Sequence, residues 1–511
     1  MNDFFNKRIS ILINKFNAKK FNEVINDSLV LLKKKENDFL WNLLGLSYQN
    51  VNQLKKSINC FENSIHINSK NISAYNNLGI SHKNLKNYQI AEHNFLKAID
   101  LNDNYLNALV NLGNLKNDTY YFDDAIFFYE KALKIDPNNV LLNLNLANVF
   151  QTINEIDKAK FYLNKILNID PLFTNADFRL SKLEKYELDS DHLDKMLKKL
   201  NDQKLDSNQK IYLYFAIAKA YEDIKQFDDC TEYLKKGNNL QRSILNYNPN
   251  FYKNLPNKII NLFNQIDYKK FSKSNEGKNN IFILGMPRSG TSLIEKIISS
   301  HSKVESLSET NFISDMIFKN LFTNFEKDID EVNVFLENNL SQEYNKFLKL
   351  FNVKSKIIID KTLSNFWCIG FIKIFFPDAK IIHSFRSPKD NVLSIYKNLF
   401  DTHEGWLYDE TELKEYYSAY KEIMTYWNNI FGNEILNFQY EDLIKNPETQ
   451  IKSLINFCDL NWEENCLNFY KNNNPIKTLS VNQANQRIYK TSVNKSELFE
   501  REIPTLFKGL I

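Results

Sequence analysis

The stretch ILGMPRSGTS, which begins at Ile283, contains residue types that bind anions at a spacing that brings them together. Gly285 and Gly290 enclose four residues, as in loops whose backbone amides cradle phosphate between a strand and a helix. A loop for nucleoside triphosphates has lysine directly after its second glycine, whereas this sequence has Thr291. The apolar run before the loop and the amphipathic pattern after it predict an anion site at a helix N-terminus, with Arg288 as the local cation.

A second anion-binding pair lies about 100 residues further along the chain, in the segment HSFRSPKDNVLSIY. Arg386 and Ser394 are eight residues apart, and the arginine follows an apolar run that is typical of a strand. An arginine at the end of a strand and a serine two helical turns later can converge on one dianion. The sequence therefore predicts two phosphate contacts, one in each segment.

Both segments resemble the nucleotide-binding motifs of the sulfotransferases. PRSGTS after a strand is similar to the 5′-phosphosulfate loop, P-K/R-S-G-T-T/S, and the spacing of Arg386 and Ser394 matches the R-x7-S signature for the 3′-phosphate. These enzymes bind 3′-phosphoadenylyl sulfate (PAPS) as co-substrate. The resemblance implies that the loop lacks lysine because a sulfuryl donor needs no metal-bound triphosphate clamp, and it implies that no metal is required.

Three further features make the resemblance to the sulfotransferases more specific. Glu309 lies 21 residues after Arg288, which is the spacing of the catalytic glutamate in the tyrosylprotein sulfotransferases. The segment DKTLSNF is similar to their D-K-x-P-x-N-F block, with Lys361 at the catalytic lysine, and FQYEDLIKNPE is similar to a Y-E-x-L element that brings Tyr440 near the nucleotide. Combined with helical repeats earlier in the chain, the sequence resembles the bacterial tetratricopeptide-repeat sulfotransferases.

The resemblance implies a role for each of these residues. Glu309 is expected to act as general base toward an acceptor hydroxyl, while Lys361 and Arg288 stabilise the sulfuryl oxygens and the leaving bridge oxygen. The residues expected to bind the nucleotide are Pro287, Arg288, Ser289, Gly290, Thr291, Ser292, Arg386, Ser394, Tyr440 and Lys490. His301 and His383 are expected to cap or pack rather than to catalyse.

Two segments depart from the family pattern. Leu363 replaces the proline that is expected two residues after the lysine. The block TLSVNQANQRIYKTSVNKSELF keeps the outline of T-A-S-x2-Q-x-R-Q-P-I-Y, but Asn485 and Arg487 stand in place of its arginine and proline. Ser496 stands where a tryptophan is common. This block is expected to contribute to the nucleotide lid or to the acceptor side.

The elements that position these residues fall into two halves with different patterns. Between residues 38 and 173 the sequence repeats itself every 34 residues. The small residue at the same place in each repeat is Gly45, Gly79, Gly113 or Ala147. This period and the W-x2-L-G-x2-Y type of motif predict a tetratricopeptide solenoid, with degenerate units at both ends that extend it over residues 1–245. Residues 174–210 have a helical pattern without a fixed register.

After about residue 250 the period ends, and short apolar runs alternate with helical patterns. The runs lie at 281–284, 356–360, 379–385 and 434–440. Such alternation is typical of a parallel sheet with helices on both faces. We therefore predict an α-helical tetratricopeptide solenoid followed by an α/β P-loop-type sulfotransferase domain with a central parallel sheet over residues 281–511. A linker and a connecting helix are expected at 246–280.

Composition and charge argue against several classes of protein. The 511 residues carry a formal net charge of +3, so neither a nucleic-acid binder nor a membrane-surface binder is expected. The five cysteines form no C-x-x-C pair, which argues against a zinc ribbon or a disulfide scaffold. The N-terminus has no sustained apolar segment, and no run of 18 or more apolar residues occurs, so the sequence predicts a cytoplasmic protein without a membrane span.

Three classes of function remain open from the sequence. The leading prediction is a PAPS-dependent sulfotransferase that modifies a hydroxyl of a protein, such as tyrosine, or of a glycan. The second is a P-loop kinase or NTPase. The missing loop lysine of this sequence argues against it, and Asp360 is only a formal candidate for its Mg²⁺ ligand. The third is a non-enzymatic repeat scaffold with a degenerate transferase domain. The concave face of the repeats is expected to bind the acceptor or a partner protein.

Overall fold

The computed structural model divides the chain into two compact units. The first contains Met1–Val149 and Phe347–Asn352, and the second contains Phe150–Lys346 and Val353–Ile511. The structure describes residues 2–271, 276–322, 328–338, 340–349, 351, 353, 355–472, 484–489 and 492–510. Each unit has hydrophobic core clusters of its own.

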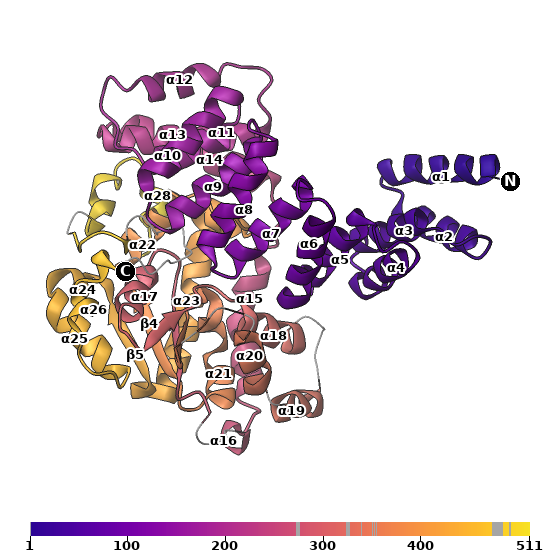
Figure 1. The fold of residues 1–511 in the computed structure, drawn as a ribbon. Helices are drawn as coiled ribbons and strands as arrows, with labels where there is room; N and C mark the ends of the chain where they lie inside the picture. Colours follow the sequence, from indigo (N-terminus) through magenta and orange to yellow (C-terminus); the bar gives the residue numbers. More distant parts are fainter. Residues whose placement is uncertain are drawn as a thin grey trace. The chain divides into compact units, whose positions relative to one another are not determined.

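The first unit is a stack of helix pairs (Figure 1), which confirms the predicted tetratricopeptide solenoid. Its helices are α1 (Asn2–Asn17), α2 (Phe21–Leu32), α3 (Asp38–Asn50), α4 (Leu54–Ile67), α5 (Ile72–Asn84), α6 (Tyr88–Leu101), α7 (Leu106–Asp118), α8 (Phe122–Ile135) and most of α9 (Val140–Thr152). α3 packs against α4, α5 against α6, and α7 against α8. Further contacts of α4 with α5 and of α6 with α7 join successive pairs, so each pair depends on its neighbours for burial.

The small residue of each repeat lies against an aromatic ring of the second helix. A Cβ atom on Gly79 would lie 2.5 Å from a carbon atom of the Phe95 ring, which is fully buried. The equivalent pairs are Gly45 with Phe61 and Gly113 with Tyr129. The recurring glycine therefore allows the two helices of a repeat to approach closely, and the ring fills the space between them.

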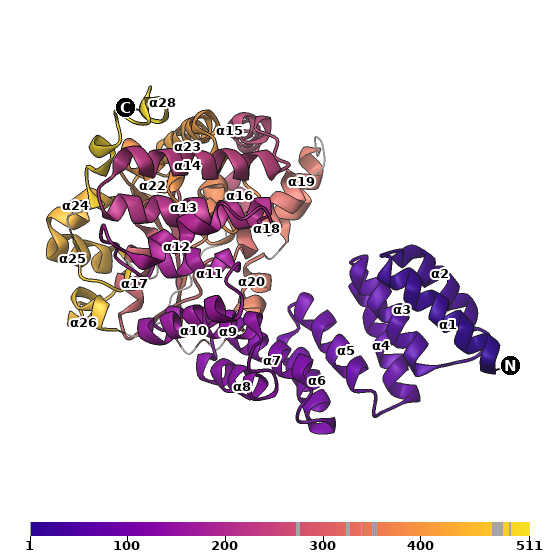
Figure 2. The same cartoon turned by 90° about the horizontal axis from the view of Figure 1, so that it is seen from above.

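The second unit begins with helices that precede the sheet in the chain. They are α10 (Ile156–Ile169), α11 (Thr174–Ser181), α12 (Asp191–Lys199), α13 (Ser207–Asp223) and α14 (Phe227–Ile244). α13 packs against both α11 and α14 (Figure 2). All five helices belong to the compact unit that holds the sheet. The predicted end of the solenoid near residue 245 therefore stays a prediction.

Five parallel strands form one sheet in the order β2-β3-β1-β4-β5. They are β1 (Asn280–Leu284), β2 (Val304–Ser306), β3 (Ile357–Asp360), β4 (Lys380–Phe385) and β5 (Ile435–Gln439). Four of them lie where apolar runs predicted strands, and β2 is additional. The predicted central parallel sheet is confirmed. β1 lies between β3 and β4, and parallel sheets bind ligands beyond the strand ends where the strand order changes direction in this way.

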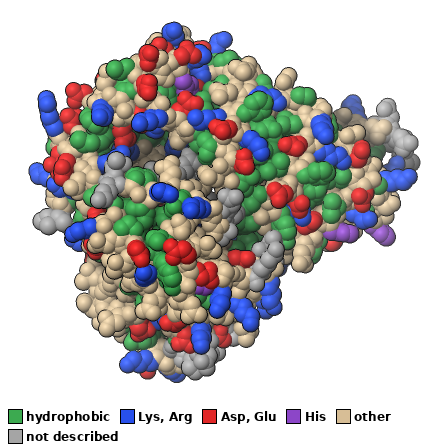
Figure 3. Space-filling model, turned by 60° about the vertical axis from the view of Figure 1, so that its left-hand side comes forward, with side chains coloured by type: hydrophobic (Ala, Val, Ile, Leu, Met, Phe, Trp, Pro, Cys, Tyr) green, Lys and Arg blue, Asp and Glu red, His purple; other side chains and the backbone are tan. Residues whose placement is uncertain are grey.

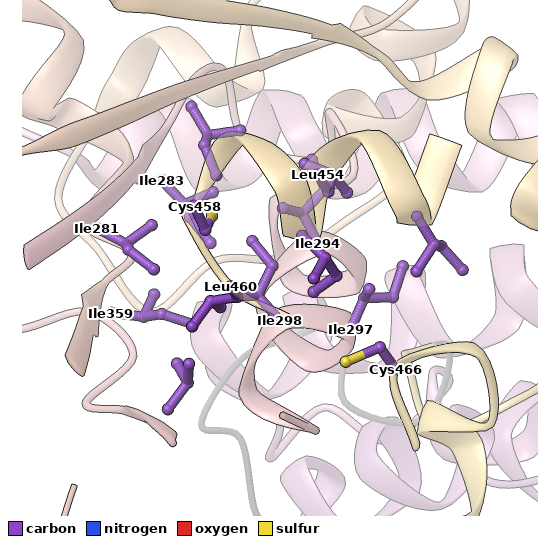
Figure 4. Close-up of a cluster of buried hydrophobic side chains, with 14 of the residues drawn as sticks. Ile281, Ile283, Ile294, Ile297, Ile298, Ile359, Leu454, Cys458, Leu460 and Cys466 are labelled. Atoms are coloured by element: carbon purple, nitrogen blue, oxygen red, sulfur yellow. The ribbon is translucent and has the colours of Figure 1, made fainter. Parts of the chain in front are cut away.

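Helices cover both faces of this sheet (Figure 1). On one face, strand side chains such as Ile283 pack against Ile294 of α17 (Thr291–Ser299) and Leu454 of α25 (Pro447–Phe457), as Figure 4 shows. Beyond α25, α26 (Glu464–Leu467) adds Cys466 to the same cluster. This core fixes α17 directly beneath the loop that precedes it.

Aromatic side chains dominate the other face. Phe282 of β1 lies 5.6 Å from the ring centre of Phe376. Phe263 of α15 (Asn250–Phe263) meets Trp427 of α23 (Glu410–Phe431) edge-on at 4.9 Å. The helix expected to connect the two halves thus packs into the domain of the sheet.

Shorter elements complete the second unit. They are α16 (Tyr268–Phe271), α18 (Phe312–Leu321), α19 (Ile329–Glu337), α20 (Leu340–Leu348), η1 (Leu363–Cys368), α21 (Ile369–Phe375), α22 (Pro388–Tyr396), η2 (Gly405–Tyr408), η3 (Gly432–Glu434), α24 (Tyr440–Lys445), η4 (Phe469–Lys471), η6 (Lys495–Leu498) and α28 (Pro504–Phe507). The last residues of α20 belong to the first unit.

Within the described ranges, none of the helices combines the length and the apolar character that crossing a membrane requires. On the face shown in Figure 3, Lys and Arg side chains are interspersed with Asp and Glu. This mixture agrees with the small formal net charge of +3.

Candidate active site

The predicted site residues follow the ends of the parallel strands. The loop of residues 285–290 follows β1, Lys361 follows β3, Arg386 follows β4 and Tyr440 follows β5. Glu309 lies three residues after β2. Because all five strands are parallel, their carboxyl ends share one edge of the sheet. A cavity of about 830 Å³ is lined there by Arg288, Glu309, Arg386, Ser394 and Tyr440, and by residues of α11, α13 and α14.

The loop after β1 has a backbone conformation that requires glycine at Gly290. Its φ is +103°, and a Cβ atom there would lie 2.6 Å from the Tyr440 ring. Arg288 also has a positive φ, of 66°. α17 begins directly after the loop, and Thr291 and Ser292 are buried in its first turn. The loop therefore leads into the positive end of a helix dipole.

Two hydrogen bonds from neighbouring elements fix the loop. The Ser384 hydroxyl donates to the carbonyl oxygen of Ser289 (2.8 Å), and the Asn391 side chain donates to that of Pro287 (2.9 Å). Among the described residues, the buried hydroxyl of Ser289 has no hydrogen-bond partner. Because a buried polar group without a partner costs free energy, this hydroxyl suits a site whose ligand supplies the partner.

Arg386 is buried at the end of β4, with 8% of its side chain exposed. Its guanidinium lies 3.5 Å from Asp390, 4.0 Å from Glu441 and 5.1 Å from the centre of the Tyr440 ring. It also donates a hydrogen bond to the carbonyl oxygen of Ser492. Its Nε atom has no hydrogen-bond partner in the described part of the chain. Arg386 thus keeps a buried donor that an anion can use.

Ser394 lies beside a second arginine. The Nε atom of Arg288 donates a hydrogen bond to the Ser394 hydroxyl (3.1 Å). Burial, and then the nearby positive charge of Arg386, lower the pKa of Arg288 to about 10. Two arginines that repel each other in a cavity that Ser394 also lines favour a multivalent anion. The structure therefore brings Arg288 together with the predicted pair Arg386 and Ser394, while its contact with sulfuryl oxygens stays a prediction.

Lys361 lies between two carboxylates. Its Nζ atom is 2.5 Å from Oε1 of Glu309 and 3.7 Å from Oε2 of Glu295. The side chains of Lys361 and Glu295 are buried, whereas that of Glu309 is 40% exposed and lines the cavity. Burial lowers the pKa of Lys361, but Glu309 and then Glu295 outweigh it, so the pKa is raised overall. The lysine is held charged beside the carboxylate that reaches the cavity.

Glu295 is a residue of this site that the sequence analysis missed. It lies on α17 and accepts hydrogen bonds from the hydroxyls of Ser306 (2.6 Å) and Ser308 (2.7 Å). Burial raises its pKa, although Lys361 acts in the opposite direction. The available signal was a glutamate within the apolar stretch SLIEKII, one turn after Thr291. A carboxylate in such a place needs a cationic or hydrogen-bonding partner.

Asp360, the formal Mg²⁺ ligand of a kinase-type site, makes other contacts. The hydroxyls of Thr310 (2.7 Å) and Tyr344 (3.0 Å) both donate to its Oδ2 atom, and burial raises its pKa. In the ranges that the structure describes, no group of three or more His, Cys, Asp or Glu side chains is arranged to hold a metal ion. Asp360 instead fixes the strand end that carries Lys361.

Two tyrosines line the cavity near the arginines. The hydroxyls of Tyr440 and Ser492 share a hydrogen bond of 2.8 Å. Burial, and then the neighbouring Tyr440, raise the pKa of Tyr489, which the sequence analysis did not single out. Lys490, predicted to bind the nucleotide, lies outside the described residues. Its role stays a prediction.

The two histidines, His301 and His383, are packed against neighbouring residues. His383 is buried, and its ring nitrogens lie 2.7 Å from Asn437 and 2.5 Å from the Tyr420 hydroxyl. Burial lowers the pKa of His383 to about 4. A ring nitrogen of His301 lies 2.9 Å from the carbonyl oxygen of Asn461. Neither histidine is among the described residues that line the cavity.

Comparison with protein-family models finds two families in separate parts of the chain. Residues 280–464 match the model described as the sulfotransferase family. Residues 40–71, 72–105 and 122–178 match models of the tetratricopeptide repeat. The first match contains the loop, Glu309, Lys361, Arg386 and Tyr440.

Among known proteins, an uncharacterised protein of Aquifex aeolicus is 28% identical over 344 residues, which are 64% of this chain and 45% of that protein. Protein-tyrosine sulfotransferase A of Caenorhabditis elegans is 25% identical over 209 residues, which are 38% of this chain and 54% of that protein. Protein-tyrosine sulfotransferase 1 of Danio rerio is 25% identical over 202 residues, which are 36% of this chain and 54% of that protein. The chain thus spans about half the length of the curated relatives it matches.

Among solved structures, that of MamA is 23% identical, covers 32% of this chain and 95% of MamA, and has a TM-score of 0.30. The structure of YrrB, a TPR protein with an unusual peptide-binding site, is 15% identical and has a TM-score of 0.29. The match covers 34% of this chain and 93% of YrrB. The chain carries tetratricopeptide repeats followed by a domain of the sulfotransferase family.

Proposed function

We propose that this chain is a PAPS-dependent sulfotransferase that transfers a sulfuryl group from 3′-phosphoadenylyl sulfate to an acceptor hydroxyl. The observation that supports this most is that Arg288, Arg386, Ser394 and Glu309 line one cavity, with Lys361 bonded to Glu309. The first three suit phosphate, and the last two suit proton transfer and charge stabilisation. An anion site beside a carboxylate–lysine pair is what transfer from a phosphate-linked donor to a hydroxyl requires.

The residues present fit a nucleotide with phosphates at two positions. Thr291 and Ser292, in the first turn of α17, would bind the 5′-phosphate, and Arg386 and Ser394 would bind the 3′-phosphate. Two of the buried donors without partners among the described residues, Ser289 Oγ and Arg386 Nε, would gain partners from this ligand. When bound, the co-substrate supplies the sulfuryl group.

Glu309 is the proposed general base. Its Oε1 atom is held by Lys361 at 2.5 Å, and its exposure to the cavity lets the carboxylate accept a proton from an acceptor hydroxyl. A positioned base typically contributes ~10²–10⁴-fold to the rate. Lys361 has further N–H donors beyond its bond to Glu309, and these can stabilise the negative charge that develops during transfer.

For the acceptor we propose a hydroxyl of a protein, with tyrosine as the first choice. Two of the similar proteins are named protein-tyrosine sulfotransferases. The tetratricopeptide repeats offer the kind of extended surface that binds acceptor or partner proteins. A glycan hydroxyl is the alternative that the same base could serve.

Calorimetric titration tests the donor site. Adenosine 3′,5′-bisphosphate is titrated with EDTA present, and ATP is titrated with Mg²⁺. We expect the bisphosphate to bind without metal and at least tenfold more tightly, because each charge-assisted hydrogen bond to the 3′-phosphate contributes roughly 1.5–3 kcal/mol. Equal affinities for the two nucleotides would contradict the proposed donor.

Transfer is tested with PAPS that carries radioactive sulfur, offered together with tyrosine-containing peptides or with glycans. We expect label on peptides that contain tyrosine and none on the same peptides with phenylalanine instead. Label on glycans alone would overturn the proposed acceptor but keep the reaction. Bisphosphate binding without transfer to any acceptor would contradict the enzymatic function.

A further inference from the structure

Part of the cavity wall comes from helices that precede the sulfotransferase-family segment. The lining residues from this region include Phe178 and Lys182 at the end of α11, Glu222 of α13 and Leu234 of α14. Lys182 lies beyond residues 122–178, the last repeat match, and before residues 280–464. Neither family model therefore accounts for it.

We infer that Lys182 binds the 3′-phosphate end of the co-substrate together with Arg288 and Ser394. This inference rests on the proposed function. It would make the helices before residue 245 part of the co-substrate site rather than a separate docking module.

The position of Lys182 is fixed by its own helix. It follows the last residue of α11, with helical backbone angles (φ −77°, ψ −16°). Its ammonium lies 4.3 Å from the centre of the Phe178 ring, one turn earlier. A lysine over an aromatic face is held by a cation–π interaction, so its charge is kept at the cavity wall.

The charges around Lys182 point to an anion. Burial, and then the positive charges of Arg288 and Arg179, lower the pKa of Lys182 to about 7. The positive charge of Arg386 in turn lowers the pKa of Arg288. Lys182, Arg288 and Arg386 thus form a chain of like charges that line one cavity. Asp390 and Glu441 offset part of the charge of Arg386, and a multivalent anion bound among the three cations would offset the repulsion that lowers the pKa of Lys182 and of Arg288.

The hydrogen bond between Arg288 and Ser394 favours the 3′-phosphate end of the nucleotide, because Ser394 is proposed to bind that phosphate. Arg288 interacts with Lys182 electrostatically and donates a hydrogen bond to Ser394, the serine of the R-x7-S pair. The pKa of Lys361, by contrast, is raised by the negative charges of Glu309, Glu295 and Asp360. The charge of Lys182 therefore belongs with the 3′-phosphate side rather than with the general base.

Ion pairs hold the helices of this wall against the phosphate-binding element. Glu222 of α13 accepts hydrogen bonds from Lys397 (2.5 Å), which follows α22, and from Lys495 (3.2 Å) of η6. The Asn238 side chain of α14 donates to the carbonyl oxygen of Tyr396 at the end of α22 (2.9 Å). Since α11 packs against α13, these contacts fix the place of Lys182 relative to α22, which carries Ser394.

The test uses the full chain with Lys182→Met, which keeps the apolar stem over Phe178 but removes the charge. Lys182→Arg restores a cation. Lys185→Ala is the matched control, because Lys185 is exposed, lies three residues further on and does not line the cavity within the described residues. Each protein is titrated with adenosine 3′,5′-bisphosphate and with adenosine 5′-monophosphate, which lacks the 3′-phosphate.

We expect Lys182→Met to weaken bisphosphate binding at least about tenfold, as for loss of one charge-assisted hydrogen bond. Affinity for the monophosphate should change less than about twofold, and Lys182→Arg and Lys185→Ala should resemble the wild type. Unchanged bisphosphate affinity in a folded Lys182→Met protein overturns the inference. An equal loss for both nucleotides also overturns it. If the wild type itself fails to bind bisphosphate, the proposed function fails instead.

Discussion

Glu295 and Glu309 contact the same lysine but differ in their access to the cavity. Glu295 is fully buried and bonded to two serine hydroxyls, whereas Glu309 is 40% exposed. A fully buried carboxylate can orient Lys361 but cannot reach an incoming hydroxyl. This difference in access supports the proposal that Glu309 accepts the proton, and we propose that Glu295 positions Lys361.

Glu309→Gln separates proton transfer from nucleotide binding. The change keeps the size of the side chain and removes the basic carboxylate, so turnover should fall by about two to four orders of magnitude. Bisphosphate affinity should stay the same, because Arg288 and Arg386 are untouched. Arg386→Ala should show the opposite pattern, with loss of affinity dominating. Near-normal turnover of Glu309→Gln at saturating PAPS and acceptor would show that another group is the base.

The lowered pKa of Lys182 predicts a pH dependence of binding. A bound phosphate raises that pKa, so the lysine's contribution is complete below its free value of about 7 and declines as the pH rises above it. Arg288, with a pKa of about 10, stays charged in this range. The charged groups of α13 that line the cavity, Lys219, Glu222 and Asp223, are common to both proteins compared.

The measurement is the ratio of bisphosphate affinities of the wild type and Lys182→Met from about pH 6 to about pH 9. Titration of the phosphate itself cancels in this ratio. We expect the ratio to fall with rising pH, and a ratio that does not change with pH would contradict the assigned charge.

At the scale of elements, the repeat pattern and four of the strands were predictable because they are local. A 34-residue period and short apolar runs are visible in the sequence itself. β2 was not predictable because its three residues, Val304–Ser306, are too few to show a pattern. The roles of Glu295 and Lys182 depend on contacts with residues tens to hundreds of positions away, which no local pattern encodes.

The repeat glycines permit a prediction whose sign separates two effects. Alanine in place of a helical glycine normally stabilises by roughly 0.5–1 kcal/mol. In Gly79→Ala the new Cβ atom would lie 2.5 Å from the buried Phe95 ring. Such overpacking costs about 1–3 kcal/mol, so we expect net destabilisation in urea unfolding followed by circular dichroism. Asn84→Ala, at an exposed position of the same helix, should change little. Stabilisation by Gly79→Ala would show that the helices can separate freely.

At the scale of the whole chain, the charge pairs of Glu222 link α13 to Lys397, which follows α22, and to Lys495 of η6. Burial raises the pKa of Glu222, but Lys397 and then Lys495 outweigh it and lower the pKa to about 2. A lowered carboxyl pKa contributes stability above the ordinary value of 4.5, and that stability is lost as the pH falls toward about 2. The melting temperature of Glu222→Gln should therefore be lower than that of the wild type near neutral pH. The difference between the two melting temperatures should shrink below about pH 4.5. A constant difference in melting temperature would contradict this link.

The division into compact units predicts which truncation preserves the proposed co-substrate site. Residues 150–511 keep α11, α13 and the cavity, so bisphosphate affinity should stay within about threefold of the full chain. A protein of residues 246–511 lacks Lys182 and Glu222 and should lose most of that affinity.

Both truncated proteins must first be shown to be soluble and to melt cooperatively. Phe351 contacts the rings of Tyr88 and Tyr120, so removal of residues 1–149 exposes it, and Phe351→Ser is included to limit aggregation. With a protein acceptor, residues 150–511 should show a raised KM, because the repeats that are proposed to bind the acceptor are gone. If residues 246–511 fold and bind bisphosphate as tightly as the full chain, the helices before the sheet have no part in the co-substrate site. If residues 150–511 keep both the affinity and the KM, the repeats do not bind the acceptor.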